Sequence, residues 1–263
     1  MNDQIILHKK DDFKYMQEAG KLAAEVLDYI TETIDVGIST NHLNDLCYKK
    51  IISAGAIPAP LNYKGFPKSI CTSINHVVCH GIPSDKLLQS GDILNIDITV
   101  ILNGWHGDSS RMYIVGKPSI MAKRLIKVTY ESMMLGIEQA KPGNTTGDIA
   151  YATQSHVEKH GYSVVRDYCG HGIGKFFHGP PNVPFYGKPT TGTVLKEGMF
   201  FTIEPMVNVG SHHTKLNIHD GWTVTTKDRK LSAQFEHTIG ITNNGCEIFT
   251  LSPKELHCPP CHL

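Results

Sequence analysis

Two aspartates stand within a pair of otherwise apolar, strand-like segments. Asp97 lies in the middle of NIDITVIL, and Asp108 follows in GDSSRM after a short turn. A carboxylate inside a sheet is costly unless a cation or a hydrogen-bond donor compensates it. The pair therefore indicates a site at which the rest of the chain supplies the compensating group.

The turn between the two aspartates predicts how they face each other. Asn103-Gly104 is a strong signal for a two-residue β-hairpin turn, which places residue 102 opposite 105 and residue 99 opposite 108. Asp97 and Thr99 then share a face, with Asp108 diagonal to Asp97 at about 7–8 Å. At this point a hairpin with a solvated polar face remains the alternative. The opposite face is predicted to be core and carries Leu94, Ile96, Ile98, Val100 and Leu102.

Two glutamates occur in comparable apolar surroundings. Glu204 lies in FFTIEP, and Glu236 lies in SAQFEHTIGIT with Gln234 and Thr238 on its face. Four carboxylates in strand-like contexts favour a shared cation over a solvated face, because like charges brought together need a counter-charge.

A glycine-rich segment, YCGHGIGKFFHGPP, offers imidazole ligands through His171 and His178. Gly174-Lys175 does not form a phosphate-binding loop, because Cys169 stands where that motif needs Gly and position 176 is Phe. We interpret the glycines as allowing the backbone to approach a crowded centre.

The elements that must position these groups form an internal repeat. Helical spacing of apolar residues predicts a helix in DDFKYMQEAGKLAAEVLDYITETI, capped by Asp11 or Asp12, and a similar helix follows Ser119. After each helix, a Thr is expected to cap a short second helix and a Gly to end it. We interpret the repeat as two fused α+β halves. The matched positions, 106 or 107 residues apart, are Gly37 and Gly143, Thr40 and Thr146, Gly55 and Gly161, Gly91 and Gly198, and Asp97 and Glu204.

Composition excludes several classes of protein. The 263 residues carry 25 basic and 25 acidic side chains, so the chain has no electrostatic footprint for nucleic acid. The apolar stretch near the N-terminus spans only residues 5–7, which predicts neither a signal peptide nor a membrane span. Seven scattered cysteines then favour reduced thiols and a cytoplasmic location.

The motifs DITV, GDSSRM, GHGIGKFFH, FTIEPM, DGWTVTTKD and SAQFEHTI together resemble the type I methionine aminopeptidases of the short bacterial form, over residues 3–249. The resemblance implies an α+β pita-bread fold, with antiparallel sheet and flanking helices. One catalytic domain would span residues 1–250, with halves at roughly 11–118 and 119–250. The implied activity is removal of the initiator methionine from nascent chains whose second residue is small, with metal-activated water attacking the scissile carbonyl.

The same resemblance implies two divalent metal ions. Four carboxylates and two such ions sum to zero net charge, which removes the repulsion within the cluster. Oxygen-rich ligation with one imidazole suits Mn, Fe or Co, and Zn is also compatible. The implied ligands are Asp97, Asp108, His171, Glu204 and Glu236, of which Asp108 and Glu236 would bridge the ions.

Catalytic and substrate-binding roles also follow from the resemblance. Glu204 would shuttle a proton from water, His178 would hydrogen-bond the peptide and stabilise the tetrahedral intermediate, and His80 would face the scissile amide. Aromatic rings and a thiol suit a methionine thioether. Independently, an assumed loop at 227–231 predicts that one of the pocket aromatics, the indole of residue 222, pairs opposite Glu236. The implied methionine pocket comprises Tyr63, Phe66, Cys71, Phe177 and Trp222.

The segment SPKELHCPPCHL has no family counterpart, and we interpret residues 251–263 as a flexible tail without a role in peptidase chemistry. Its HCPPCH motif could bind zinc or copper, or act as a dithiol. Two rivals share the fold: a proline-directed peptidase, which usually carries a large extra N-terminal domain, and a binding module that has lost its metal ligands. The expected partners are the N-terminal Met of nascent polypeptides and the ribosome; we expect a monomer that binds neither nucleic acid nor membrane.

Overall fold

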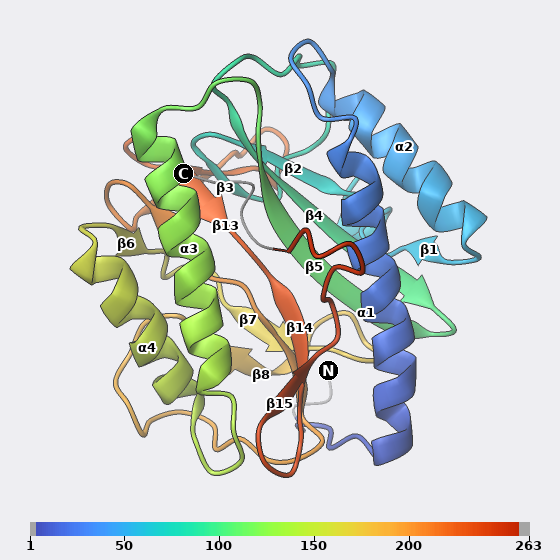
Figure 1. Ribbon diagram of the computed structural model, residues 1–263, viewed down its shortest axis with the longest axis vertical. Helices are drawn as coiled ribbons and strands as arrows, with labels where there is room; N and C mark the ends of the chain where they lie inside the picture. The colour runs from blue at the N-terminus through green and yellow to red at the C-terminus, as the bar shows by residue number, and fades with distance from the viewer. Residues whose placement is uncertain (1–3, 258–263) are drawn as a thin grey trace.

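The computed structural model describes residues 4–257, in which two pairs of α-helices flank antiparallel sheets (Figure 1). Figure 1 shows α1 and α2 along one side of the strands and α3 and α4 along the other. None of these helices combines the length and apolar content needed to span a membrane. The helices are α1 (Lys10–Thr31), α2 (Thr40–Ser53), α3 (Ile120–Glu138) and α4 (Thr146–Lys159), with a short 3₁₀ helix at Tyr63–Gly65.

The described strands form four small sheets, and every pairing between them is antiparallel. One sheet joins β1, β4, β2 and β5; the others have the orders β13-β10-β6, β11-β12-β3 and β15-β14-β9-β7-β8. The α+β class expected from the sequence is therefore confirmed. The strands are β1 (Ile57–Pro58), β2 (Cys71–Ile74), β3 (Val77–Cys79), β4 (Ile93–Leu102), β5 (Trp105–Ile114), β6 (Ser163–Val164), β7 (Gly170–Gly172), β8 (Gly179–Val183), β9 (Phe200–Ile203), β10 (Met206–Asn208), β11 (Thr214–Leu216), β12 (Val224–Thr226), β13 (Ser232–Gln234), β14 (His237–Ile241) and β15 (Cys246–Ile248).

The repeated segments have matching structures. Helices α2 and α4 are both 14 residues long, and Gly55 and Gly161 follow them with φ of 74° and 79°. The predicted caps are wrong by one position: Ser39 and Thr145 cap these helices through their hydroxyls. An N-cap residue has extended backbone, and that conformation belongs to the residue before each predicted cap.

The predicted cap of α1 is also wrong. Lys9 occupies the N-cap position, and Asp12 lies inside the first turn, where its carboxylate accepts a 2.9 Å hydrogen bond from the Lys9 N–H. An acidic side chain there satisfies a free backbone donor and interacts favourably with the helix dipole. Aspartate is therefore favoured both at the N-cap and in the first turn, and the sequence alone did not separate these positions.

The β4–β5 hairpin follows the predicted register. Leu102 pairs with Trp105 and Thr99 pairs with Asp108. The intervening Asn103 has a φ of 51° and is followed by a glycine at 81°, as a type I′ turn requires. The predicted core face is confirmed for Leu94, Ile96, Ile98 and Val100, which are buried; Leu102 is half-buried.

Each helix pair covers its own hydrophobic core. Val26 and Leu27 of α1 share one core with Ile96 of β4, whereas Ile126 of α3 shares another with Phe201 of β9. Burial of these apolar faces holds each helix pair against its strands. The polar faces of the strands are thereby directed toward the middle of the molecule, where the predicted ligands lie.

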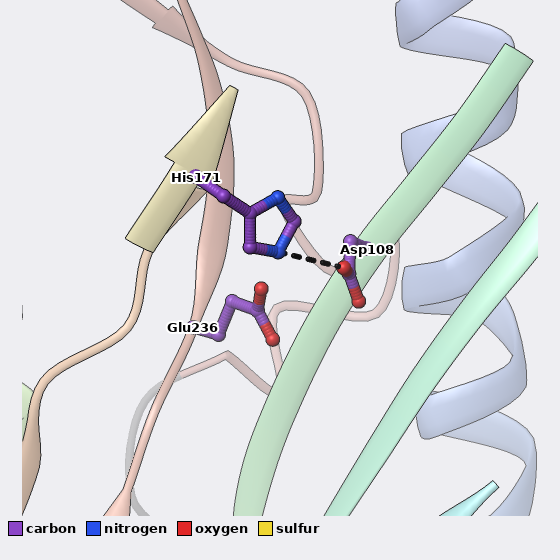
Figure 2. Close-up of side chains that lie close together, drawn as sticks. All are labelled: Asp108, His171 and Glu236. Carbon is purple, nitrogen blue, oxygen red and sulfur yellow. Dashed lines mark ion pairs between the residues drawn. The ribbon is translucent and has the colours of Figure 1, made fainter. Parts of the chain in front are cut away.

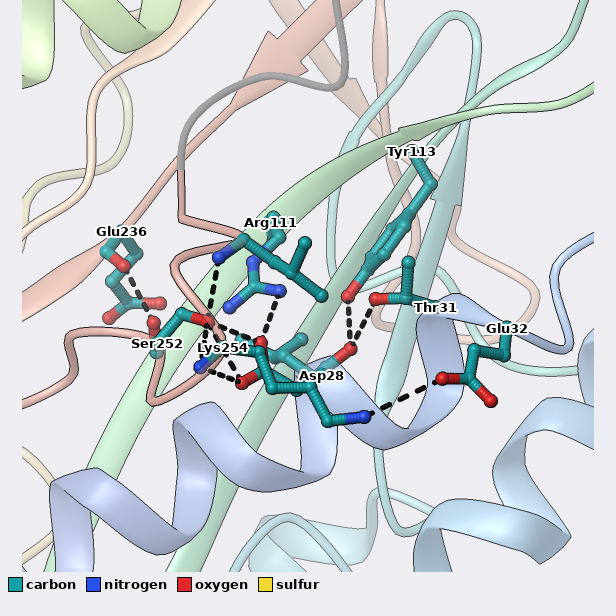
Figure 3. Close-up of polar contacts among 11 residues, drawn as sticks. Asp28, Thr31, Glu32, Arg111, Tyr113, Glu236, Ser252 and Lys254 are labelled. Carbon is teal, nitrogen blue, oxygen red and sulfur yellow. Dashed lines mark hydrogen bonds and ion pairs between the residues drawn. The ribbon is translucent and has the colours of Figure 1, made fainter.

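The chain beyond residue 250 packs against α1 (Figure 3). The Ser252 hydroxyl donates a 2.7 Å hydrogen bond to Asp28, which also forms a 2.8 Å ion pair with Arg111. Asp28 and Arg111 are only 2% and 4% exposed. The described part of the predicted tail, residues 251–257, therefore contacts the fold; Cys258 and Cys261 lie outside the described residues.

Candidate metal centre

Strands β4 and β5 supply the first two predicted ligands. Asp97 lies on β4 between Cys71 of β2 and Ser110 of β5. Asp108 is 4% exposed, and its Oδ1 accepts a 2.7 Å hydrogen bond from the Thr99 hydroxyl. The cross-strand pairing of Thr99 with Asp108 therefore fixes the orientation of this carboxylate.

Glu236 reaches the same place from the second half of the chain. Its N–H donates a 3.1 Å hydrogen bond to the Ser110 carbonyl, forming an isolated antiparallel bridge between the segment before β14 and β5. The Thr238 hydroxyl adds a 2.6 Å hydrogen bond to the Asp108 carbonyl. These contacts join the two halves where the carboxylates meet.

His171 is oriented for ligation by its backbone neighbourhood. Its Nδ1 lies 3.2 Å from the Gly172 carbonyl oxygen, which can only accept, so Nδ1 carries the proton and Nε2 carries the lone pair. The flanking glycines permit this position. A Cβ at Gly170 would lie 2.3 Å from the Thr202 carbonyl oxygen and one at Gly172 2.0 Å from that of Pro180, which confirms the close backbone approach inferred from the sequence.

Glu204 follows β9 and is held by two donors. The Thr202 hydroxyl donates a 2.7 Å hydrogen bond to Oε1, and the Gln234 amide donates a 3.2 Å hydrogen bond to Oε2. The same Thr202 hydroxyl oxygen accepts a 3.0 Å hydrogen bond from the His171 N–H. One threonine therefore couples the positions of the two ligands.

The three side chains of Figure 2 form the tightest part of the cluster. Asp108, His171 and Glu236 place ligand atoms within 4.8 Å of one another. Nε2 of His171 lies 3.7 Å from Oδ2 of Asp108 and 3.6 Å from Oε1 of Glu204. Buried carboxylate oxygens around an unprotonated imidazole nitrogen are a donor set for a divalent cation.

The electrostatics of the cluster point to the same conclusion. Burial raises the pKa of Asp97 to about 7 and that of Glu204 to about 8. Burial, and then the neighbouring carboxylates, also raise the pKa values of Asp108 and Glu236 well above their usual range. Burial lowers the pKa of His171 to about 4. Carboxylates this crowded need cations to stay ionised near neutral pH, so the residues fit divalent metal.

A cavity of about 860 Å³ surrounds the cluster, and every site residue predicted from the sequence lines it. On its wall, Tyr63 packs against Phe177 and His178 with ring centroids 4.9 and 5.2 Å away, and Phe66 packs edge-on against Trp222 at 5.2 Å. His80 lies at the backbone turn after β3 and has a φ of 56°. The roles of these residues stay predictions.

The predicted pairing of Trp222 opposite Glu236 is wrong. The strand that follows Trp222, β12, pairs with β11 and β3, whereas β13 pairs with β10, so residues 227–231 do not close a hairpin. Trp222 instead reaches the cavity beside Phe66 and His80.

Sequence reasoning missed residues that support the ligands. Thr202 was not singled out, although it precedes Glu204 by two positions and period-two alternation would have placed both on one face. His106 was also missed: it stacks on Phe177 at 5.6 Å and contacts the Gly174 carbonyl through Nδ1 at 2.9 Å. No local pattern links His106 to the loop that it supports.

Comparison with known families now agrees with this geometry. A sequence model described as metallopeptidase family M24 matches residues 14–243. The chain belongs to metallopeptidase family M24. The cluster of Asp, His and Glu side chains is the place where this family membership predicts metal.

Individual members of the family are similar over nearly the whole chain. A methionine aminopeptidase of Rickettsia prowazekii is 65% identical over 256 residues, covering 97% of this chain and 99% of the relative. One from Escherichia coli K12 is 54% identical, covering 94% of each chain. A crystal structure of methionine aminopeptidase from Rickettsia prowazekii superposes with a TM-score of 0.94 at 64% identity, covering 94% of this chain and 100% of that one. The chain thus has the pita-bread fold of these enzymes.

Proposed function

We propose that this M24 chain is a methionine aminopeptidase, a metal-dependent hydrolase that removes the initiator methionine from nascent proteins when the second residue is small. The observation that carries the proposal is the cluster of Asp108, His171 and Glu236, whose two carboxylates are buried, in the wall of a cavity that aromatic side chains also line. High identity to relatives with that activity supports the same reading.

We assign two divalent ions, Mn, Fe or Co with Zn as a further candidate, to the five-residue cluster. Such ions, when bound, lower the pKa of a shared water and polarise the scissile carbonyl. Their charge would replace the protons that the crowded carboxylates otherwise retain, and the oriented Nε2 of His171 would complete an oxygen-rich donor set. The ligands are Asp97, Asp108, His171, Glu204 and Glu236.

The remaining chemistry falls to groups of the chain itself. Glu204 accepts a proton from the attacking water and passes it to the leaving amine. Hydrogen bonds from Thr202 and Gln234 hold its carboxylate in place for this role. Burial, followed by the neighbouring His171, lowers the pKa of His178 to about 2, so His178 acts as a neutral N–H donor to the developing oxyanion. His80 faces the scissile amide and the leaving side.

The methionine side chain would lie among Tyr63, Phe66, Cys71, Phe177 and Trp222. Cys71 is buried, and burial is the main reason why its pKa is raised well above that of a free thiol. It therefore contributes a neutral, polarisable surface. Together with the aromatic rings it suits a flexible thioether, which gains dispersion and sulfur–aromatic contacts there.

The test is a peptidase assay on metal-stripped protein with Met-Ala-Ser and Ala-Pro-Ala peptides, in the presence of Mn²⁺, Co²⁺, Fe²⁺ or Zn²⁺. We expect metal-dependent release of Met from the first peptide alone. Cleavage of the second peptide would identify a proline-directed peptidase instead. If no peptide is cleaved with any metal, the five residues hold a structural metal ion, and the chain is better explained as a non-catalytic binding module.

We also propose that the protein acts as a monomer in the cytoplasm, on chains emerging from the ribosome. The substrate itself, a newly made N-terminus, supports that location. Sedimentation of the purified protein with and without ribosomes would test both the oligomeric state and the association.

A further inference from the structure

The N-terminal segment, residues 4–8, forms part of the cavity wall, and the proposed function gives it no role. Gln4, Ile6 and His8 line the cavity. Ile5, between two of them, packs instead against the core that α3 shares with β9. Side chains of an extended segment alternate between its two sides, so this pattern directs every second residue of the segment toward the cavity.

His8 holds the N-terminal segment in place through an aromatic stack. Its ring lies almost parallel to that of Phe200, with centroids 4.2 Å apart and an interplanar angle of 4°, and its centroid is 5.4 Å from that of Trp105. The His8 N–H donates a 2.7 Å hydrogen bond to the Gly198 carbonyl. A Cβ at Gly198 would lie 2.4 Å from the His8 carbonyl oxygen, so glycine is needed for the two backbones to approach this closely.

His8 also lies beside the loop that carries Phe177 and His178. A Cβ at Gly174 would lie 3.0 Å from Cε1 of His8. The loop turns sharply there, since the Gly174 N–H donates a 3.2 Å hydrogen bond to the Phe176 carbonyl. The N-terminal segment and this loop therefore border the cavity together, next to the groups proposed to bind the methionine and the oxyanion.

Two large apolar side chains of this border are exposed. Ile6 is 42% exposed and Phe176 is 62% exposed, although both line the cavity. Phe66 and Cys71 of the proposed methionine pocket, in contrast, are buried. Ile6 and Phe176 thus mark the open end of the cavity. Exposed apolar surface that is continuous with a binding cavity is typical of a place that a ligand covers.

The size of the cavity leaves room for more than one residue of a peptide. Its volume is about 860 Å³, and cavities of about 300–1,000 Å³ hold ligands of drug size. In the proposed reaction the first residue of the substrate lies beside the metal cluster, so the rest of the peptide must leave through the open end. An extended chain advances about 3.3 Å per residue, which brings the residues after the second to that end.

We propose that Ile6 and Phe176 form a subsite for an apolar side chain of the peptide substrate, at the third residue or beyond, and that His8 is the positioning residue that holds Ile6 there. This inference rests on the proposed function, because it takes the substrate to be a methionyl peptide. Contact with the peptide removes both exposed surfaces from water and strengthens its binding. The Gln4 amide, on the same wall, can exchange hydrogen bonds with the peptide backbone.

Steady-state kinetics with three amidated peptides tests the subsite. Met-Ala-amide ends at the second residue, Met-Ala-Ser-Ser-amide continues with polar side chains, and Met-Ala-Leu-Leu-amide continues with apolar ones. We expect the KM of the wild type for the leucyl peptide to be about three- to tenfold below that for the seryl peptide, since each buried methylene contributes about fourfold to an equilibrium constant. Equal KM values would overturn the inference and leave the proposed function intact.

Matched variants identify the residues of the subsite. Ile6→Ala should raise the KM for the leucyl peptide by about three- to tenfold. Its kcat, and its KM for Met-Ala-amide, should stay at the wild-type values, because only binding remote from the reacting bond is lost. Phe176→Ala should behave in the same way. Leu7→Ala is the control, since Leu7 is an exposed apolar neighbour that is not among the residues lining the cavity. A wild-type KM for the leucyl peptide in Ile6→Ala would contradict the assignment.

The positioning role of His8 is tested by rescue. His8→Ala removes the ring that stacks on Phe200 and should raise the KM for the leucyl peptide as Ile6→Ala does. His8→Phe keeps a stacking ring and should restore the wild-type KM. Circular dichroism and turnover of Met-Ala-amide, unchanged in both variants, separate this effect from a loss of folding. A wild-type KM in His8→Ala would show that the stack does not position the segment.

The same peptides separate this inference from the proposed function. A wild type that hydrolyses all three peptides without preferring the leucyl one retains the proposed function and lacks the subsite. A wild type that hydrolyses none of them would overturn the proposed function, and the subsite with it.

Discussion

The Thr99 hydroxyl donates a 2.7 Å hydrogen bond to Oδ1 of Asp108 across the β4–β5 hairpin. The second half repeats the relationship, because the Thr202 hydroxyl donates a 2.7 Å hydrogen bond to Oε1 of Glu204. In both halves a threonine thus orients a carboxylate of the proposed metal site through one of its oxygens, and in Glu204 the Gln234 amide also donates to the other oxygen.

Replacing Thr99 by Val should loosen Asp108 without removing it. Groups that orient a ligand typically contribute about 10–100-fold to metal affinity, so we expect a loss of that size for Thr99→Val. Competition titration with a coloured chelator measures it. Thr225→Val, on β12, is the control and should leave the affinity unchanged. Wild-type affinity in Thr99→Val would mean that the hydrogen bond has no orienting role.

Glu204→Gln should largely abolish turnover. Glutamine keeps the shape of the side chain but cannot take up a proton, and loss of a general base costs about 10²–10⁴-fold in rate. Initial rates at saturating metal provide the measurement, with circular dichroism as the check on folding. Turnover near the wild-type value would exclude Glu204 as the proton shuttle.

Asp108→Ala should reduce the binding of both ions, because the proposed role of Asp108 is to bridge them. Plasma emission spectrometry of the dialysed protein would give the metal content. A stoichiometry that stays at two ions per chain would show that Asp108 does not bridge.

The metal-free protein should lose stability as pH rises from about 7.5 to 8.5. Burial raises the folded pKa of Asp97 to about 7 and of Glu204 to about 8, whereas both carboxylates are already ionised in the unfolded chain. The folded state therefore binds more protons, and the free energy of unfolding falls. The buried histidines oppose this trend only below pH about 7.5, since unfolded histidine, with a pKa of about 6.5, is mostly neutral above that pH.

Urea denaturation at several pH values measures this dependence, and we expect a total loss of about 1–3 kcal/mol. Asp97→Asn removes one of the titrating groups and should flatten the slope. Saturating divalent metal should reverse it, because ligation favours the ionised carboxylates. A free energy of unfolding that rises over this pH range without metal would contradict the assignment.

Asp28→Ala should strongly destabilise the protein, since it leaves Arg111 buried without its 2.8 Å partner. Removing one member of a buried ion pair costs about 3–5 kcal/mol. Ser252→Ala removes only a neutral donor and should cost about 1 kcal/mol. Urea denaturation compares the two variants. Equal losses would indicate that the ion pair contributes nothing beyond the tail contact.

Local features of this fold were predictable from the sequence, whereas pairings between distant segments were not. Asn103-Gly104 correctly specified the hairpin register because a two-residue turn leaves few alternatives. Trp222 was misplaced because β12 pairs with β11 and β3 instead of with β13, the strand that follows it along the chain. The contact between Ser252 and Asp28 joins segments that are far apart in the chain, and no periodic pattern in the sequence predicts it.

The candidate site shows the same division. Period-two alternation and the repeat placed Asp97, Asp108 and Glu204 in related strand positions, but the complete ligand set came from the family resemblance. The supporting roles of Thr202 and His106 depend on which loops approach them in three dimensions. Hydrogen bonds of this kind follow from the fold and not from local sequence.

The bridge between Ser110 and Glu236 bears on how the protein matures during synthesis. The β4–β5 hairpin can form early, because its two strands are adjacent in the chain. Glu236 is synthesised long after Asp97 and Asp108, so the growing polypeptide holds an unfinished set of acidic ligands until then. Assembly of the proposed metal site is thus expected to await the synthesis of Glu236, and a prematurely terminated product without Glu236 would lack one of the proposed ligands.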